Sequence, residues 1–139
     1  MREVFGEAVD TSRVTVRRSK WWWFQPRNVT MAPTGHLHFH PAGDSYCEDF
    51  STSSPAMQRH FIHEMTHIWQ MQKRGWWYVP FWGAMQRRYS YKLKPGKCLE
   101  KYGVEQQAEI VADAFMARRG WRDWTARLER LADLPIFPA

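Results

Sequence analysis

Two histidines and a glutamate near the middle of the chain have the residue types and spacing of a catalytic zinc site. His63 and His67 stand four residues apart, and Glu64 follows the first of them. On a helix this spacing places both imidazoles on one face, one turn apart, where they can share one tetrahedral metal. A carboxylate beside the first histidine can act as general base toward water activated by the metal. The pattern therefore predicts Zn²⁺ held by His63 and His67, with Glu64 as the catalytic base.

A catalytic zinc also needs a third protein ligand. Metzincins carry a third histidine six residues after the second, but this position is Lys73, which excludes that class. The gluzincin-like alternative is a glutamate on a later helix, followed four residues on by an acid that hydrogen-bonds a ligand histidine. The sequence offers Glu105 with Glu109 behind it, or Glu109 with Asp113 behind it. We favour Glu105 and keep Glu109 as the supporting acid or the alternative ligand.

Helices with recognisable ends should carry both parts of this site. Residues 51–54 are Ser-Thr-Ser-Ser, good N-cap material, and a proline follows them. We therefore expect a long helix over 55–74 that stops at Gly75, with apolar residues at helical spacing. A second helix is expected over 104–119, ended by Gly120.

The remaining chain predicts short elements around these two helices. They are strands over 13–17, 29–31 and 35–41, short helices over 2–9 and 121–131, and mostly loop over 76–101. Because strands come first and helices later, we predict a single α+β domain over residues 1–139. Its small antiparallel or mixed sheet should pack on the 55–74 helix, and a second helix should bear the third ligand.

Composition is that of a folded chain with a basic surface. The 139 residues are 44% hydrophobic, include nine Trp and carry a net charge of +6. Such a charge can attract nucleic acid, anionic lipid or acidic cell-wall polymer, or simply favour solubility, and its even spread along the chain favours solubility. Nine Trp exceed what a small core readily absorbs, so several should line a groove or an interface.

Two patterns near the N-terminal end have both a functional and a plain structural interpretation. Arg17 to Trp23 mixes cations with aromatics, as binders of single-stranded nucleic acid or of lipid surfaces do, but a strand edge with solvated cations and packed Trp is favoured. His36, His38 and His40 alternate on one strand face. They are expected to form a cleft wall and not a second metal site, and the strand could bind an extended peptide by edge addition.

Several further roles stay open on the sequence. Zinc hydrolysis uses a donor that stabilises the oxyanion, and a Tyr, His or Arg could serve. The available tyrosines are Tyr46, Tyr78, Tyr89, Tyr91 and Tyr102, and the sequence does not choose between them. Cys47 and Cys98 form no CxxC pair, so they could form one disulfide or remain thiols. The N-terminal residues lack the features of a secretory signal, and the chain has no run of 18 apolar residues. We therefore expect synthesis in the cytoplasm and no membrane span.

Beyond the zinc motif, the sequence resembles the small metallopeptidase domains found with VgrG-type spike proteins of type VI secretion systems, often labelled vgr-related proteins. The resembling segments are Phe24-Gln25-Pro26, Met31-Ala32-Pro33, the stretch GHLHFHPAG at 35–43, HEMTHIWQ at 63–70 and YGVEQQAEIV at 102–111. Together they span residues 24–111 and are far more specific than the zinc motif alone.

This resemblance implies a zincin core with Zn²⁺ held by two His and a Glu. Carried over to this sequence, His63 and His67 are ligands, Glu64 is the base, and Glu105 best matches the third ligand. It further implies an antibacterial effector that cleaves peptide or amide bonds in the periplasm of a target cell and is neutralised by a cognate immunity protein. The chain contains no spike domain, so delivery would be in trans or through a fusion.

Two other functions compete with this prediction. The basic charge would also suit a DNA-associated metalloprotease or nucleic-acid-binding domain. Salt-dependent binding to single-stranded DNA would favour that alternative. Alternatively, the domain could be a non-catalytic, zinc-stabilised adaptor on the spike, which would keep its partner after Glu64→Ala. A nucleic-acid partner is the less favoured.

Overall fold

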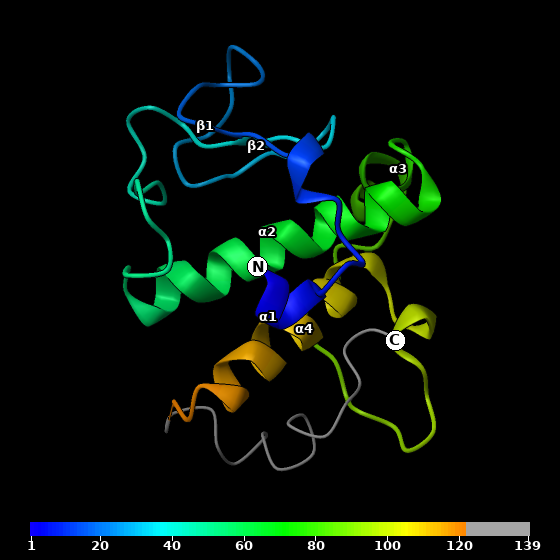
Figure 1. Cartoon of the computed structure of the whole chain (residues 1–139). Helices are drawn as coiled ribbons and strands as arrows, with labels where there is room; N and C mark the ends of the chain where they lie inside the picture. Colours follow the sequence, from blue (N-terminus) through cyan, green and yellow to red (C-terminus); the bar gives the residue numbers. More distant parts are fainter. Residues whose placement is uncertain (122–139) are drawn as a thin grey trace.

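Two packed helices form the centre of the protein in a computed structural model that describes residues 1–121 (Figure 1). They are α2 (Pro55–Arg74) and α4 (Val104–Arg118). The remaining elements are α1 (Arg2–Phe5), β1 (Val16–Arg17), β2 (Leu37–His38), α3 (Tyr78–Met85) and 3₁₀ turns at Thr11–Arg13 and Leu99–Lys101.

The ends of α2 and α4 follow from their flanking residues, as the sequence predicts. The Ser54 hydroxyl accepts a hydrogen bond from the Met57 backbone N–H at 3.4 Å, and proline occupies the first helical turn. Gly75 ends α2 with a φ of 98°, a conformation that favours glycine. α4 starts after Gly103 and ends one residue earlier than expected.

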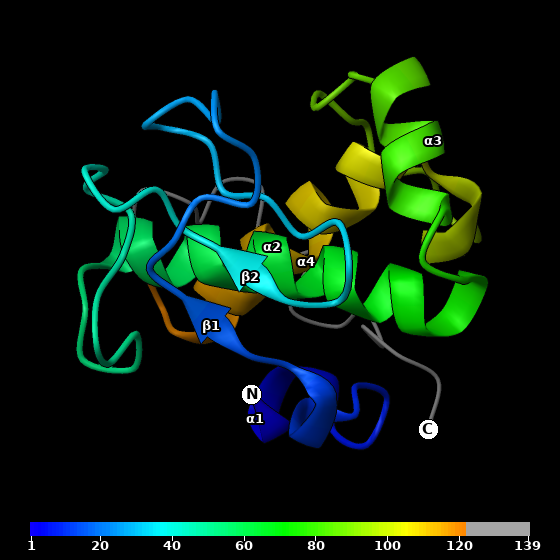
Figure 2. The ribbon, with the colours of Figure 1, turned by 90° about the horizontal axis from the view of Figure 1, so that it is seen from above.

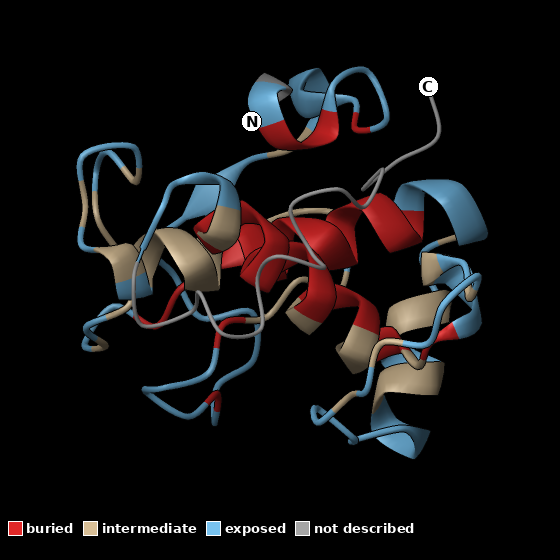
Figure 3. Ribbon diagram, turned by 90° about the horizontal axis from the view of Figure 1, so that it is seen from below, coloured by how far each residue is buried: buried red, intermediate tan, exposed pale blue. Residues whose placement is uncertain are grey.

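The core is built on α2, which is covered on two sides. Every residue from Ile62 to Met71 is buried, as the red centre of Figure 3 shows. α4 packs along one side, and β2 crosses the other (Figure 2). Leu37 and Phe39, on either side of His38, are fully buried against this core. The HExxH segment thus lies in the most enclosed part of the molecule.

The sheet is smaller than predicted and mixed in direction. β1 and β2 pair in parallel, with Val16 opposite Leu37, and Met31 forms an isolated antiparallel bridge with His38. The strands expected over 13–17 and 35–41 are therefore reduced to two residues each. Mostly helical with this small parallel pair, the described chain fits the predicted α+β class.

The short elements depart from the sequence expectation in the segments 76–101 and 2–9. The expected loop over 76–101 is wrong in its first part, because α3 occupies 78–85 there, with Pro80 in the first turn, where no intrahelical N–H bond is lost. The helix expected over 2–9 ends at Phe5, before Gly6 with its φ of 50°. The helix expected over 121–131 lies outside the described residues. None of the described helices combines the length and apolarity needed to cross a bilayer.

Candidate metal centre

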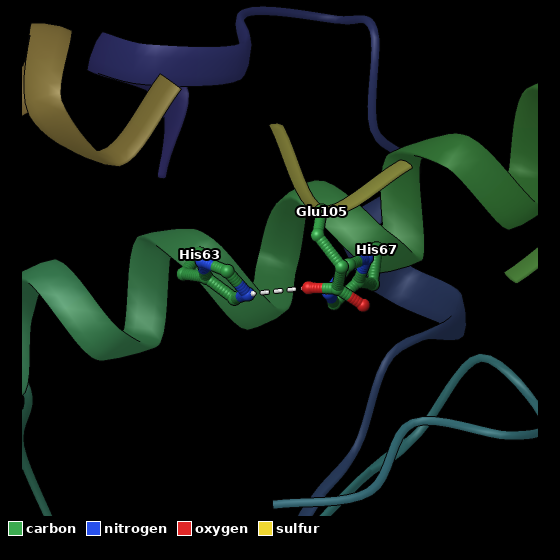
Figure 4. A group of neighbouring side chains, drawn as sticks. All are labelled: His63, His67 and Glu105. Atoms are coloured by element: carbon green, nitrogen blue, oxygen red, sulfur yellow. Dashed lines mark ion pairs between the residues drawn. The ribbon is translucent and has the colours of Figure 1, made fainter. Parts of the chain in front are cut away.

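Two turns of α2 and the first turn of α4 bring three ligand-type side chains together. His63 and His67 project from α2 toward Glu105 of α4 (Figure 4). One Glu105 oxygen, Oε2, lies 3.4 Å from the Nε2 atom of His63 and 3.4 Å from that of His67. One ligand atom from each of the three side chains lies within 4.8 Å of the other two, which is close enough to hold a metal ion. Within residues 1–121 this is the group of His, Cys, Asp or Glu side chains that converges in this way.

The spacing of these atoms suits a tetrahedral metal. Two ligand atoms that each lie about 2.1 Å from a tetrahedral Zn²⁺ are separated by about 3.4 Å. The two observed separations from Glu105 Oε2 have this value. Two imidazole nitrogens and one carboxylate oxygen also form a donor set that zinc accepts in catalytic sites. The residues present therefore fit the metal that the sequence predicts.

Glu109 occupies a different position from Glu105, although the sequence allowed either as ligand. Its Oε1 lies 3.0 Å from Nδ1 of His63, on the ring side opposite the Glu105 contact. Arg59 holds Glu109 in place and also donates to Asp113 Oδ1 at 2.7 Å. Tyr91 donates its hydroxyl to the other Asp113 oxygen at 2.5 Å. Glu105 is therefore the glutamate that lies near both histidine Nε2 atoms, whereas Glu109 lies against the other nitrogen of His63.

His67 is oriented by an amide in place of an acid. Its Nδ1 lies 2.9 Å from the Gln70 side-chain oxygen, so the ring donates there. The Gln70 amide in turn donates to the Val104 carbonyl and to Gln107 Oε1, both at 3.0 Å. Gln70 is 1% exposed. This bond chain ties the second histidine to the start of α4, the turn that carries Glu105.

His63 and Glu105 have strongly shifted pKa values. Burial would lower the pKa of His63, but hydrogen bonds with Glu105 and Glu109 outweigh it and raise the pKa to about 9. Burial would likewise raise the pKa of Glu105, but its bonds with His63 and His67 lower the pKa to about 2. A proton on His63 therefore stands in for the positive charge that a metal would supply to the same carboxylate.

Glu64 lies beside a histidine that the sequence did not single out. The Glu64 residue is 8% exposed, and its Oε1 lies 3.8 Å from Nε2 of His60, one helical turn earlier. The same His60 nitrogen lies 2.8 Å from the Thr30 hydroxyl. Burial lowers the pKa of His60, which favours the neutral ring. The four-residue spacing between His60 and Glu64 was the sequence signal for their contact. The contact between Thr30 and His60 depends on the fold and has no such signal.

The histidines at 36, 38 and 40 do not join the metal centre. Their residues contribute no ligand group to any close cluster in the described chain. Nor is β2 available for edge addition, because both of its edges are used: Leu37 and Phe39 donate to β1 and its flank, and His38 exchanges bonds with Met31. The predicted strand edge for substrate is therefore misplaced at 35–41.

Among the five tyrosines, Tyr89 has a ring contact with a candidate ligand. Its ring is nearly parallel to that of His63, with centroids 6.4 Å apart. Burial, and then the charges of Glu105 and Glu64, raise the pKa of Tyr89, which keeps its hydroxyl protonated and able to donate. The Tyr91 and Tyr102 hydroxyls are used elsewhere, on Asp113 and on the segment 92–94. Cys47 and Cys98 are both free thiols.

Comparison with known proteins shows that this chain is similar to an effector domain. The chain is 36% identical over 145 residues to the type VI secretion system spike protein VgrG2b of Pseudomonas aeruginosa, an alignment that takes in 97% of this chain but only 14% of that protein. The solved effector domain of Pseudomonas aeruginosa VgrG2b matches with a TM-score of 0.78 at 37% identity, covering 94% of this chain and 75% of that one. No family model matches the sequence.

Proposed function

Since the chain belongs to the family of the VgrG2b effector domain, we propose that it is a zinc-dependent metallopeptidase of zincin-like fold that acts as a type VI secretion effector. The observation that carries the enzymatic part is the position of Glu105 Oε2, 3.4 Å from both histidine Nε2 atoms. A helical HExxH pair closed by a glutamate from a second helix matches the ligand set of gluzincin-like hydrolases.

Each polar side chain of the centre has a distinct part in this proposal. His63, His67 and Glu105 hold the metal, while Glu109 and Gln70 fix the two imidazole rings. Zn²⁺, when bound, supplies Lewis acidity that acidifies water and polarises a carbonyl oxygen. Glu64 takes a proton from the attacking water and returns it to the leaving amine.

The segment around Met31 gives the substrate a place to lie. Met31 uses its backbone on His38, and within residues 1–121 no backbone–backbone hydrogen bond involves Thr30 or Ala32. Thr30 also contacts His60, the neighbour of Glu64. An extended peptide that adds to this free edge would pass alongside the centre. This edge replaces the one expected on 35–41.

Delivery and partners follow from the family and are proposed with it. The related protein is a spike protein, of which the matching part is 14% of the length. We infer that this domain reaches its target on a VgrG-type spike, that it cleaves peptide or amide bonds in the target periplasm, and that a cognate immunity protein neutralises it.

Elemental analysis of purified protein tests the centre. We expect one Zn²⁺ per chain in wild type, loss in His63→Ala and Glu105→Gln, and retention with weaker affinity in Glu109→Gln. Absence of zinc after refolding with added metal would overturn the proposal. Retention in Glu105→Gln with loss in Glu109→Gln would reverse the two glutamate roles.

Expression in the periplasm of a test bacterium, with Glu64→Gln as the matched inactive form, tests the effector part. Toxicity of the wild type, without toxicity of Glu64→Gln, would support a hydrolase. Spike binding by both forms, without toxicity in either, would support the zinc-stabilised adaptor instead.

A further inference from the structure

Charges are unevenly divided along the chain. Residues 11–43 carry five Lys or Arg and residues 65–99 carry seven, and neither segment contains Asp or Glu. All fourteen acidic residues therefore lie elsewhere, together with the other eight Lys and Arg. The two acid-free segments hold a formal charge of +12, and the rest of the chain holds −6. The modest net charge conceals this separation.

Exposed aromatic rings lie on a loop in the first acid-free segment. They are Trp21, Trp22, Trp23 and Phe24, of which Trp23 is 77% exposed. The loop is held from inside by Gln25, whose amide donates to the carbonyls of Val29 at 2.7 Å and His38 at 3.0 Å. Gln25 itself is buried. The amide lies inside and the rings outside, which reverses the usual distribution.

A second exposed apolar group surrounds α3 in the other acid-free segment. It consists of Trp76, Trp77, Phe81 and Met85, of which Trp76 is 71% exposed. α3 contains no charged residue, and none of its residues is buried. A surface helix ordinarily turns its apolar residues inward and its charges outward. Here exposed cations flank the helix instead, at Arg74 before it and at Arg87 and Arg88 after it.

These two groups, which we call the aromatic rim, border the metal centre. Thr30, six residues after Phe24, has its hydroxyl 2.8 Å from Nε2 of His60, which in turn neighbours Glu64. Gly83 of α3 lies so close to Glu105 that a Cβ there would be 3.5 Å from its Oε1. Figures 2 and 3 show the loop and α3 projecting from the same side of α2. Both parts of the rim therefore lie on one side of α2, near the residues of the metal centre.

We propose that the aromatic rim docks the domain on an anionic lipid surface and holds the metal centre beside the bilayer. Trp rings favour the membrane interface, and Lys or Arg near it are attracted by anionic headgroups. Exposed rings on a loop and a short helix can enter the headgroup region without a membrane span. The twelve Lys and Arg residues of the two acid-free segments supply the positive charge that anionic headgroups attract. This docking depends neither on zinc nor on hydrolysis.

The packing of the rings favours lipid over nucleic acid. Phe24 meets Trp22 at an interplanar angle of 65° and Trp23 at 82°, both edge to face. With this packing the rings of Trp22, Trp23 and Phe24 form one compact apolar cluster. Single-stranded nucleic acid instead needs separate open ring faces on which successive bases stack.

Vesicle flotation with the full chain tests the proposal. Vesicles of phosphatidylglycerol with phosphatidylethanolamine should bind the protein, more weakly at high salt, and phosphatidylcholine vesicles should bind it poorly. Trp23→Ser with Phe24→Ser, and separately Phe81→Ser with Met85→Ser, should each weaken binding at least about ten-fold. Arg87→Gln and Arg88→Gln should cost about five-fold each. Matched controls outside the rim are Trp121→Ser, an exposed Trp, and Lys101→Gln, an exposed cation.

Three results would overturn the proposal: no binding to the anionic vesicles, equal losses in rim and control variants, or tighter binding to a single-stranded oligonucleotide than to the vesicles. The rim side chains are exposed, so their variants should keep the circular dichroism spectrum and metal content of wild type. Glu64→Gln should float with the vesicles as wild type does. A failure of the proposed hydrolysis is thereby distinguished from a failure of docking.

Discussion

Glu64 is the residue on which hydrolysis should depend while metal binding does not. It follows His63 on α2, and it is not one of the three side chains whose ligand atoms converge. We expect Glu64→Gln to retain zinc and the fold, and to lose hydrolysis by at least about 100-fold, since proton transfer through a positioned base is removed. Metal content and peptide hydrolysis, measured on one preparation, check this. A variant with normal turnover would remove Glu64 from the base role.

Tyr89 is the tyrosine that should matter for turnover and not for metal. Its ring lies 6.4 Å from that of His63, and its raised pKa keeps the hydroxyl protonated. If it donates to the developing oxyanion, Tyr89→Phe should lower kcat by about 10²–10³-fold with little change in zinc content. Tyr91→Phe is the comparison, because that hydroxyl is committed to Asp113. Equal kinetic losses in both variants would argue against a special role for Tyr89.

Stability should depend on pH through His63 and Glu105. In the metal-free protein the pKa of His63 rises from 6.5 to about 9, so its contribution to stability is complete below pH 6.5 and is lost as pH rises through about 9. The pKa of Glu105 falls from 4.5 to about 2, so its contribution is complete above 4.5 and is lost as pH falls through about 2.

Zinc needs unprotonated His63, so metal binding strengthens over the range in which the metal-free protein weakens. The difference in Tm between zinc-loaded and metal-free protein should therefore widen from pH 6.5 to 9. Thermal scans at several pH values measure it, with His63→Ala as the form that should show no widening. A constant difference in wild type would contradict the prediction.

At the residue scale, motif spacing predicted most of the site but left a choice that sequence could not settle. Glu105 and Glu109 stand one turn apart on the same helix face, and each has an acid four residues later, so periodicity treats them alike. Only the approach of α4 to α2 distinguishes Nε2 from Nδ1 of His63. His60 was missed because its partner Thr30 is distant in sequence.

Gln70 is the point where the two central helices and the site are joined. Its oxygen holds His67, and its amide donates to Val104 and Gln107 of α4. Gln70→Ala should destabilise the fold by about 1–3 kcal/mol, because buried polar groups lose their partners. It should also weaken zinc binding, by about 10–100-fold, because His67 loses its orienting acceptor. Denaturant unfolding and metal titration measure the two effects.

Gln70→Glu separates those effects. It keeps an acceptor for His67 but removes the donors to α4, so stability should fall while zinc affinity stays above that of Gln70→Ala. Equal zinc affinity in the two variants would show that the bond to His67 does not orient the ring.

At the element scale, prediction succeeded where local signals are strong. α2 and α4 have caps, glycine ends and a helical period, and both were found nearly to the residue. β1 and β2 are two residues each, too short for alternation to define, and they are fixed by tertiary pairing. α3 was missed because it has no buried face and therefore no amphipathic period, and because its aromatics and Pro80 resemble a loop.

At the scale of the whole molecule, charge and apolar surface are sorted by segment. Within residues 1–121 the exposed large apolar residues, apart from Met1 and Trp121, fall in the same acid-free segments that carry twelve of the cations. From the sequence we expected the net charge of +6 to be evenly spread and the Trp side chains to pack behind residues 17–20. The fold instead gathers the rings on one side. Composition could not show that the rings are exposed. Their exposure depends on the loop conformation, in which the Gln25 side chain turns inward and the neighbouring rings turn outward.

A bound metal should stabilise the fold by cross-linking α2 and α4. His63 and His67 belong to α2 and Glu105 to α4, so an ion bound to all three would join the two helices that hold most of the buried residues in the described chain. A ligand that binds only the folded state stabilises it by about 4 kcal/mol at 1,000 times its Kd. In a domain of this size that corresponds to a rise in Tm on the order of ten degrees.

Thermal unfolding with zinc, and after chelation and dialysis, measures this rise. His63→Ala is the control, because it removes one ligand and should make Tm independent of zinc. Glu64→Gln should respond to zinc as wild type does, since it leaves all three proposed ligands in place. An equal rise in wild type and His63→Ala would mean that zinc binds elsewhere, and no rise in either would mean that α2 and α4 are held together by Gln70, Arg59 and apolar packing alone.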